Sequence, residues 1–175
     1  MKLLLKIVGG LLVLIVVLVV GIFTVARFHD GPLEIISGGA FTTGEQYTGT
    51  EPDWSFVHDI ETVEFQLLDP DRSRTTWIVE HEGRIFIPSG YMNSLMGKIW
   101  KHWPMEAEKD GRILLRVNGV IYQRQLVRVM EGDFLEPVLA ELGRKYMGLD
   151  LSTDTDVPVD IVSSGSLWLF ELKPR

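Results

Sequence analysis

The chain has 175 residues, a formal charge of −7 and no cysteine. This length accommodates one ordinary domain, because domains usually span about 100 to 200 residues. The lack of cysteine excludes disulfides, thiolate catalysis, and zinc or iron–sulfur centres with cysteine ligands.

An apolar stretch from Ile7 to Ala26 contains no charged residue and consists almost entirely of Leu, Val and Ile. An α-helix of this length crosses a hydrocarbon core of about 30 Å, so we predict that residues 7–26 contact a lipid bilayer. A cleaved signal peptide is the alternative, because Thr24, Val25 and Ala26 form a small-residue site. We favour a retained anchor, because apolar signal-peptide regions usually have only about 7 to 15 residues.

Charged residues around the stretch predict its orientation. Lys2 and Lys6 precede it, and Arg27 is the only Lys or Arg between it and Ile60. The positive-inside rule therefore predicts a single-pass protein of a bacterial inner membrane, with a cytoplasmic N-terminus and a periplasmic C-terminal domain. The segment that follows is acidic and would repel an anionic lipid surface or a nucleic acid, so no nucleic-acid partner is expected. Its acidic residues are Asp30, Glu34, Glu45, Glu51, Asp53 and Asp59.

Composition divides the chain into an anchor at 1–27, a lead-in at 28–60 and a domain at 61–175. The lead-in is rich in Gly, Thr, Pro and acidic residues and predicts an irregular neck with one or two short strands. In the domain, short apolar runs bounded by turn residues predict strands, beginning with Val63 to Leu68. A hairpin is expected to pair Thr75 to Glu80 with Arg84 to Pro88 across His81-Glu82-Gly83.

A second hairpin is predicted between Arg112 to Val117 and Ile121 to Val129, across Asn118-Gly119, the dipeptide preferred in type I′ turns. One face of its second strand carries Tyr122, Arg124, Leu126 and Arg128. Neither face is purely apolar, which leaves open a polar interior or a subunit contact.

Two helices complete the expected elements. Asn93 or Ser94 can cap the first, whose apolar stripe is formed by Leu95, Met96, Ile99, Trp100 and Trp103. Pro104 either ends this helix or begins a second turn at Met105 to Lys109. Asp133 to Tyr146 predicts another amphipathic helix, and Ser166 to Leu172 a last strand.

Familiar catalytic motifs are absent: the sequence contains no HExxH, no GxxxxGK[ST] and no GxSxG. The four histidines, His29, His58, His81 and His102, are scattered and interpreted as isolated side chains, so no metal site is predicted. Arg74 either belongs to a solvated turn after Asp69-Pro70-Asp71 or meets an anion with its guanidinium. Ser89, Gly90, Ser94 and Lys98 surround a predicted helix start, where a phosphate could bind.

The segments from Arg74 to Val79, from Gly83 to Gly90, Lys98, and Ile113 to Val129 together resemble the flavin-binding split β-barrel proteins. These include pyridoxamine phosphate oxidase-like and deazaflavin-dependent nitroreductase-like enzymes. The resemblance covers about Val63 to Val129, with Trp168 to Arg175 similar to the closing strand. It implies a mainly β fold with flanking helices, a split barrel of antiparallel strands, and a homodimer with a cofactor site at its interface.

The resemblance also implies site residues. Arg74, Thr75, Thr76 and Trp77 would line one side of an FMN or deazaflavin, and Pro88, Ser89 and Gly90 the other. Lys98 would bind the phosphate, while Gln123 or Arg124 would reach in from the partner subunit. The expected function is a membrane-anchored flavin- or deazaflavin-linked oxidoreductase acting on a small molecule, with no catalytic side chain assigned. The alternative is a cofactor-free accessory or structural subunit of a membrane complex.

Overall fold

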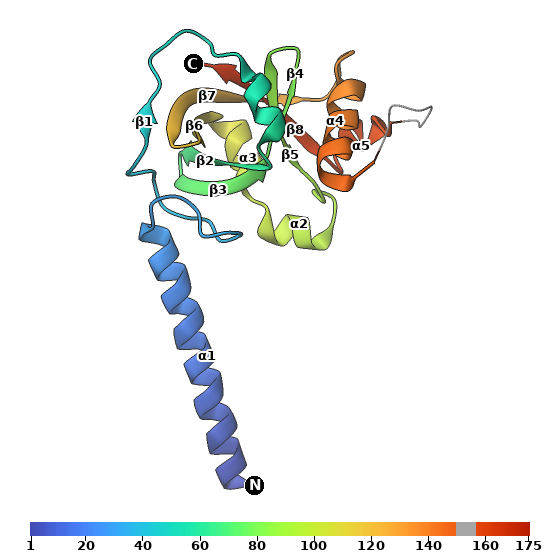
Figure 1. The fold of residues 1–175 in the computed structure, drawn as a ribbon. Helices are drawn as coiled ribbons and strands as arrows, with labels where there is room; N and C mark the ends of the chain where they lie inside the picture. The colour runs from blue at the N-terminus through green and yellow to red at the C-terminus, as the bar shows by residue number, and fades with distance from the viewer. Residues whose placement is uncertain (150–156) are drawn as a thin grey trace.

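A computed structural model describes residues 1–149 and 157–175. Its elements follow one another along the chain as a long helix, an irregular segment, and then strands interleaved with short helices (Figure 1). They are α1 (Lys2–Phe28), β1 (Glu45–Gln46), the 3-10 helix η1 (Trp54–Asp59), β2 (Thr62–Leu68), β3 (Asp71–Trp77), β4 (Val79–His81), β5 (Arg84–Ser89), α2 (Leu95–Trp100), α3 (Trp103–Lys109), β6 (Arg112–Val117), β7 (Val120–Val129), α4 (Leu135–Met147), α5 (Asp160–Ser163) and β8 (Trp168–Pro174).

One curled sheet forms the body of the domain, with the strand order β3-β2-β6-β7-β8-β5-β4. Neighbours along this path are antiparallel, and β1 adds to β7 in parallel beside Val120 and Ile121. The order confirms an antiparallel half-barrel of the split-barrel type, which follows a long apolar helix.

The inside of the curl is the main core. Phe65, Leu115 and Tyr122 lie opposite one another on β2, β6 and β7, so their side chains share the inner face. Helix α3 covers this core with Trp103, whose ring centroid lies 5.0 Å from that of Phe65 and 5.3 Å from that of Phe170. A second cluster packs the apolar stripe of α4 against β4, β5 and β8.

The first part of the lead-in is packed on the edge strand β3. Gly38 exchanges backbone hydrogen bonds with Ser73 of β3, and the N–H of Gly39 donates to the carbonyl of His29. A Cβ on Gly39 would lie 2.6 Å from the carbonyl oxygen of Arg27, so only glycine fits there. These contacts fix the end of α1, where Ala26 is fully buried, to the edge of the barrel.

An arginine of β6 fastens the same lead-in. Nη1 of Arg116 lies 3.0 Å from Oδ1 of Asp30, and its Nε lies 2.6 Å from Oε2 of Glu64. Burial alone would raise the pKa of Asp30, but hydrogen bonds from Thr43, Thr42 and Arg116 hold the pKa well below its ordinary value. Asp30 is therefore a charged anchor point for the lead-in.

The first predicted hairpin needs a correction. Its turn at Glu82 and Gly83 is present, but it joins only β4 and β5. Thr75, Thr76 and Trp77 belong to β3 and pair with β2. The strands separate at Ile78, whose backbone N–H and carbonyl are within 2.9 Å of the Tyr146 hydroxyl. The Tyr146 side chain of α4 thus forms hydrogen bonds with the backbone groups of Ile78 that would otherwise have paired with a neighbouring strand.

Most other predicted elements are present. Asn118 and Gly119 both have positive φ, as a type I′ turn requires, between β6 and β7. The hydroxyl of Ser94 accepts a hydrogen bond from the N–H of Gly97, which confirms it as the cap of α2. The first helix is shorter than predicted, because Trp103 belongs to α3, with Pro104 in its first turn. The last strand is β8, which starts two residues later than predicted and ends at Pro174.

Candidate functional site

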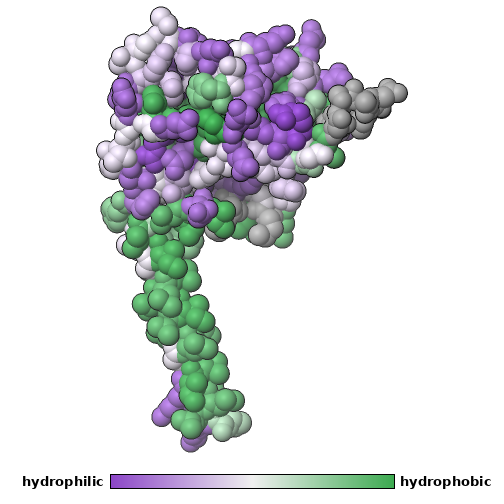
Figure 2. Space-filling view, viewed as in Figure 1, coloured by the Kyte–Doolittle hydropathy of each residue, from purple (hydrophilic) through white to green (hydrophobic). Residues whose placement is uncertain are grey.

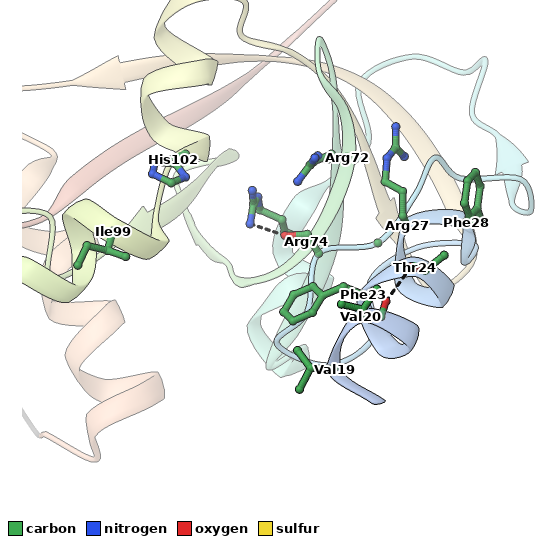
Figure 3. Close-up of a pocket in the computed structure, with 12 residues that line it drawn as sticks. Val19, Val20, Phe23, Thr24, Arg27, Phe28, Arg72, Arg74, Ile99 and His102 are labelled. Atoms are coloured by element: carbon green, nitrogen blue, oxygen red, sulfur yellow. Dashed lines mark hydrogen bonds between the residues drawn. The ribbon is translucent and has the colours of Figure 1, made fainter. Parts of the chain in front are cut away.

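A cavity of about 710 Å³ lies where α1 meets the barrel. Its walls come from the last turns of α1, the lead-in, β3, α2 and the start of α3 (Figure 3). They are formed by Val19, Val20, Phe23, Thr24, Arg27, Phe28, Ser37, Gly38, Arg72, Arg74, Ile99 and His102. Small-molecule sites usually have volumes of about 300 to 1,000 Å³, so the cavity can hold an organic ligand.

Two arginines of β3 supply the charge of this cavity. Arg72 and Arg74 are two residues apart on the edge strand, so both side chains leave the same face. Figure 3 shows them between the end of α1 and His102. Arg27, in the last turn of α1, adds a third guanidinium to the lining.

The guanidinium of Arg74 forms a hydrogen bond through one nitrogen, while another nitrogen has no partner among the described residues. Its Nη1 donates to Oγ of Ser37 at 2.6 Å, whereas its buried Nε has no partner in the described part of the chain. Burial lowers the pKa of Arg74, and the charge of Glu106 opposes this. An arginine remains protonated under such conditions, so the cavity keeps a fixed positive charge.

The opposite wall is apolar. Val19, Val20 and Phe23 of α1 face the cavity together with Ile99 of α2. A cavity with guanidinium groups on one wall and aliphatic and aromatic groups on the other suits a ligand that joins an anionic group to an apolar or ring-shaped body.

The remaining β3 residues of the predicted site lie away from this lining. Thr75 is exposed, and Thr76 is half-buried. Trp77 stacks on Tyr146 with 4.5 Å between ring centroids and 6° between ring planes, so one face of its indole is covered by α4. Of the four residues predicted on this strand, only Arg74 lines the cavity.

The predicted Ser89–Gly90 corner is a second, separate location. Pro88 is half-buried, and the buried hydroxyl of Ser89 donates to the sulfur of Met92. The ammonium of Lys101 donates to the carbonyl of Gly90 at 2.9 Å, and burial lowers the pKa of Lys101. Lys98 belongs to α2, but its side chain lies outside the described part of the structure.

The two residues predicted to reach a partner's cofactor have different environments. Gln123 is exposed, whereas Arg124 is only 3% exposed. Nη1 of Arg124 lies 2.8 Å from Oε2 of Glu51, and its guanidinium carbon lies 4.8 Å from the ring centroid of Trp54. Arg128, on the same face of β7, pairs with Glu108 of α3 at 2.6 Å. The mixed face of β7 is therefore a polar interior.

Sequence reasoning did not assign Arg27, Arg72 and His102 to the site. Arg27 and Arg72 were visible as basic residues beside the apolar stretch and in the Asp69 turn, but nothing local indicated that these segments meet. The apolar wall was equally hidden, because it belongs to the predicted anchor. Among residues 1–149 and 157–175, no group of three His, Asp or Glu side chains could hold a metal ion.

No family model and no curated protein matches the chain. Seven chains of solved structures match, among them the following three at low identity. The conserved hypothetical protein Rv2991 of Mycobacterium tuberculosis matches with a TM-score of 0.49 and 13% identity, covering 78% of this chain and 85% of that one. A Listeria innocua protein, provisionally named a pyridoxamine 5′-phosphate oxidase, has a TM-score of 0.44 and 10% identity, covering 69% and 89%. The heme storage protein HutZ of Vibrio cholerae has a TM-score of 0.42 and 11% identity, covering 69% and 85%. The resemblance indicated by the sequence is thus found again as a structural match, and the split-barrel arrangement itself rests on the strand order of this chain.

Proposed function

We propose that this protein is a membrane-anchored redox protein that binds a phosphate-bearing flavin or deazaflavin in the cavity beside α1. The observation that carries the proposal is the meeting of Arg72 and Arg74 with the apolar end of α1 around one cavity. The guanidinium groups would bind the phosphate, and the apolar wall would hold a ring system.

The anchor is the first part of the proposal. Helix α1 has 27 residues. Among the helices in the described part of the chain, it is the one that is long and apolar enough to cross a membrane. At 1.5 Å per residue it spans about 40 Å, which exceeds a hydrocarbon core of about 30 Å. Lys2 and Lys6 at its start support an orientation with a cytoplasmic N-terminus and a periplasmic barrel. The burial of Ala26 supports retention, because cleavage after this residue would remove part of the fold.

The residues present fit a phosphate-bearing group. The exposed Arg72 carries a guanidinium of the kind that recognises phosphate, and Arg74 adds its positive charge to the same lining. In the second location Ser89, Gly90 and Lys98 would contribute if the ligand extends toward α2. Bound flavin or deazaflavin supplies the hydride or electron transfer, and the protein binds and orients it.

The position of the cavity indicates the substrate class. Because Val19, Val20 and Phe23 belong to the apolar helix, a molecule dissolved in the bilayer has an apolar route along α1 to the cavity. We propose a small apolar redox partner of the quinone-like type. The predicted homodimer stays a prediction, and the mass of the protein in nanodiscs tests it.

A cofactor-free accessory subunit of a membrane complex is the second candidate. Two contacts favour it. In each, a residue of the same chain occupies the side of a predicted cofactor-binding residue that a cofactor would otherwise contact. Tyr146 covers one face of Trp77, and Glu51 neutralises Arg124. On this alternative the cavity would receive a side chain of another subunit.

The absorbance spectrum of the purified full-length protein separates the two candidates. The protein, in nanodiscs, is incubated with FMN or a phosphate-bearing deazaflavin and freed of unbound ligand by gel filtration. A bound chromophore at near-equimolar ratio is expected. A colourless protein at micromolar concentration would contradict the redox function and leave the accessory subunit.

A further inference from the structure

Four large apolar side chains are exposed at the end of α1, in the lead-in and on α2. They come from three separate segments, and they are Phe28 (84% exposed), Ile35 (86%), Leu95 (75%) and Ile99 (61%). We call this set the base. Exposed apolar side chains that gather in one place usually mark an interaction site, whereas single ones need no explanation.

Ile35 is presented by a tight turn. The N–H of Leu33 donates to the carbonyl of Ile36 at 3.0 Å, and the N–H of Ile36 donates back to Leu33 at 2.8 Å. Glu34 and Ile35 form the tip of this two-residue turn, and Glu34 has a φ of 53°. The turn thus presents an isoleucine whose side chain is 86% exposed.

Leu95 and Ile99 are presented by α2. They are four residues apart and therefore lie on one face of this helix. Ile99 also lines the cavity together with Val19, Val20 and Phe23. This shared cavity places α2 beside the last turns of the apolar helix, rather than on the far side of the domain.

The depth of these contacts indicates the partner. Val19 precedes the end of α1 by nine residues, which is about 13 Å along a helix that rises 1.5 Å per residue. If α1 crosses a bilayer, a side chain that shares a cavity with Val19 lies at the level of the acyl chains or headgroups. Figure 2 shows the apolar surface continuing from α1 onto the domain around its root, while hydrophilic residues cover the upper part.

Charges near the base agree with a phospholipid surface. Arg27 and Arg72 lie at this level, and interfacial arginines bind headgroup phosphates. Of the six acidic lead-in residues, Asp30, Glu51 and Asp53 have partners in the chain, whereas Glu34, Glu45 and Asp59 are exposed. Asp30 pairs with Arg116, Glu51 pairs with Arg124, and Glu34 remains exposed beside Ile35.

We propose that the base is a membrane-docking surface, with Ile35, Leu95, Ile99 and Phe28 inserted at the lipid interface around α1. The domain would then rest on the bilayer in a fixed orientation instead of swinging on a free tether, and the cavity would open toward the lipid. This inference rests on the anchoring part of the proposed function, but not on the identity of the cavity ligand.

The absence of cysteine makes a direct test possible. Single variants Ile35→Cys, Leu95→Cys and Ile99→Cys of the full-length protein are labelled with an environment-sensitive fluorophore. They are studied in nanodiscs of phosphatidylcholine and phosphatidylglycerol. Val13→Cys, in the middle of α1, reports membrane insertion itself. Met130→Cys, at a 45% exposed methionine outside the base, and Glu82→Cys, in the β4–β5 turn, are the matched controls.

Brominated lipids should quench the three base labels and the Val13 label, and aqueous iodide should quench the base labels several-fold less than the controls. Base labels as accessible to iodide as Met130, with Val13 quenched by brominated lipid, would overturn the docking surface while leaving the anchor intact. Shielding from iodide without quenching by brominated lipid would show a protein partner and would also overturn it. A Val13 label that brominated lipid does not quench would refute the anchor and this inference together. The affinity for the cavity ligand is measured separately, so failure of the docking surface is distinguishable from failure of the cofactor site.

Discussion

The hydroxyl of Tyr146, on α4, interrupts the strand that would otherwise continue from Trp77. It accepts a hydrogen bond from the N–H of Ile78 at 2.9 Å and lies 2.7 Å from the carbonyl of Glu61. Its ring stacks on Trp77. One tyrosine thus joins α4 to the edge of the sheet, next to the predicted cofactor position.

Replacing Tyr146 with Phe should change the pH dependence of stability. Burial raises the pKa of Tyr146 to about 12. Because this exceeds the ordinary value of 10.0, the neutral hydroxyl stabilises the fold fully below pH 10, and this contribution is lost as the pH rises toward 12. Tyr146→Phe should lower the free energy of unfolding by about 1 to 3 kcal/mol below pH 10, because buried backbone groups lose their partner.

Urea unfolding at several pH values measures this effect. The difference between Tyr146→Phe and the unmodified protein should shrink between pH 10 and 12. Tyr47→Phe is the control, because its hydroxyl donates to the carbonyl of Thr50 at an exposed site. An equal alkaline loss of stability in Tyr146→Phe and the unmodified protein would show that this hydroxyl does not titrate as described.

Arg124 should act in folding and not in ligand binding. Replacing Glu51 with Gln leaves a buried guanidinium without its counter-charge, and we expect a loss of about 1 to 3 kcal/mol in the free energy of unfolding. This loss in the free energy of unfolding is smaller than for a fully buried ion pair, because the Glu51 side chain is 44% exposed. Arg124→Met, which keeps an unbranched side chain without the charge, should bind FMN as tightly as the unmodified protein. Weaker FMN binding in a stably folded Arg124→Met protein would instead support the partner-subunit role implied by the resemblance.

Lys98 tests whether the ligand extends to α2. If its ammonium makes a charged hydrogen bond to the phosphate, Lys98→Ala should weaken FMN binding by about 1 to 3 kcal/mol. Lys109→Ala, at an exposed position of α3, is the matched control for the loss of one positive charge. Equal FMN affinities for both variants and the unmodified protein would remove Lys98 from the site.

The orientation of the chain is open to chemical labelling in intact cells. Glu82→Cys, in the turn between β4 and β5, should react with a membrane-impermeant maleimide if the domain lies in the periplasm, as we propose. Leu3→Cys, at the start of α1, should react only after the cells are permeabilised. The reverse pattern would invert the topology, and labelled Glu82→Cys found only in the soluble periplasmic fraction would indicate a cleaved signal peptide.

Local signals predicted the elements whose cause is local. Asn118 and Gly119 supply the two positive φ values of the β6–β7 turn, and Ser94 caps α2 with its own hydroxyl. Gly148 ends α4 with a φ of 63°, a conformation that glycine adopts readily at the end of a helix. In each case the hydrogen bond or the backbone freedom comes from a residue in the turn itself or at the helix end. The local sequence pattern was therefore sufficient to predict these elements.

The features that the sequence did not predict have causes that lie far apart in the chain. The strand break at Ile78 depends on Tyr146, and Lys145 also donates to the carbonyl of Ile78 at 3.0 Å. The burial of Arg124 depends on Glu51, in a lead-in whose packing the sequence left open. The cavity depends on α1, β3 and α2 meeting, which no spacing or periodicity reveals. Of the predicted cofactor residues, sequence reasoning therefore placed Arg74 in the cavity but not its neighbours.

The FMN affinity of Arg74→Gln tests the central claim most directly. FMN and riboflavin, which lacks the phosphate, are titrated into full-length protein in nanodiscs, with Arg112→Gln as the control, since Arg112 pairs with Asp110 away from the cavity lining. Arg74→Gln should bind FMN about tenfold or more weakly, in keeping with one lost charged hydrogen bond, and riboflavin unchanged. FMN binding that is equal in Arg74→Gln, Arg112→Gln and the unmodified protein, or absent from all three, would contradict a phosphate site in this cavity.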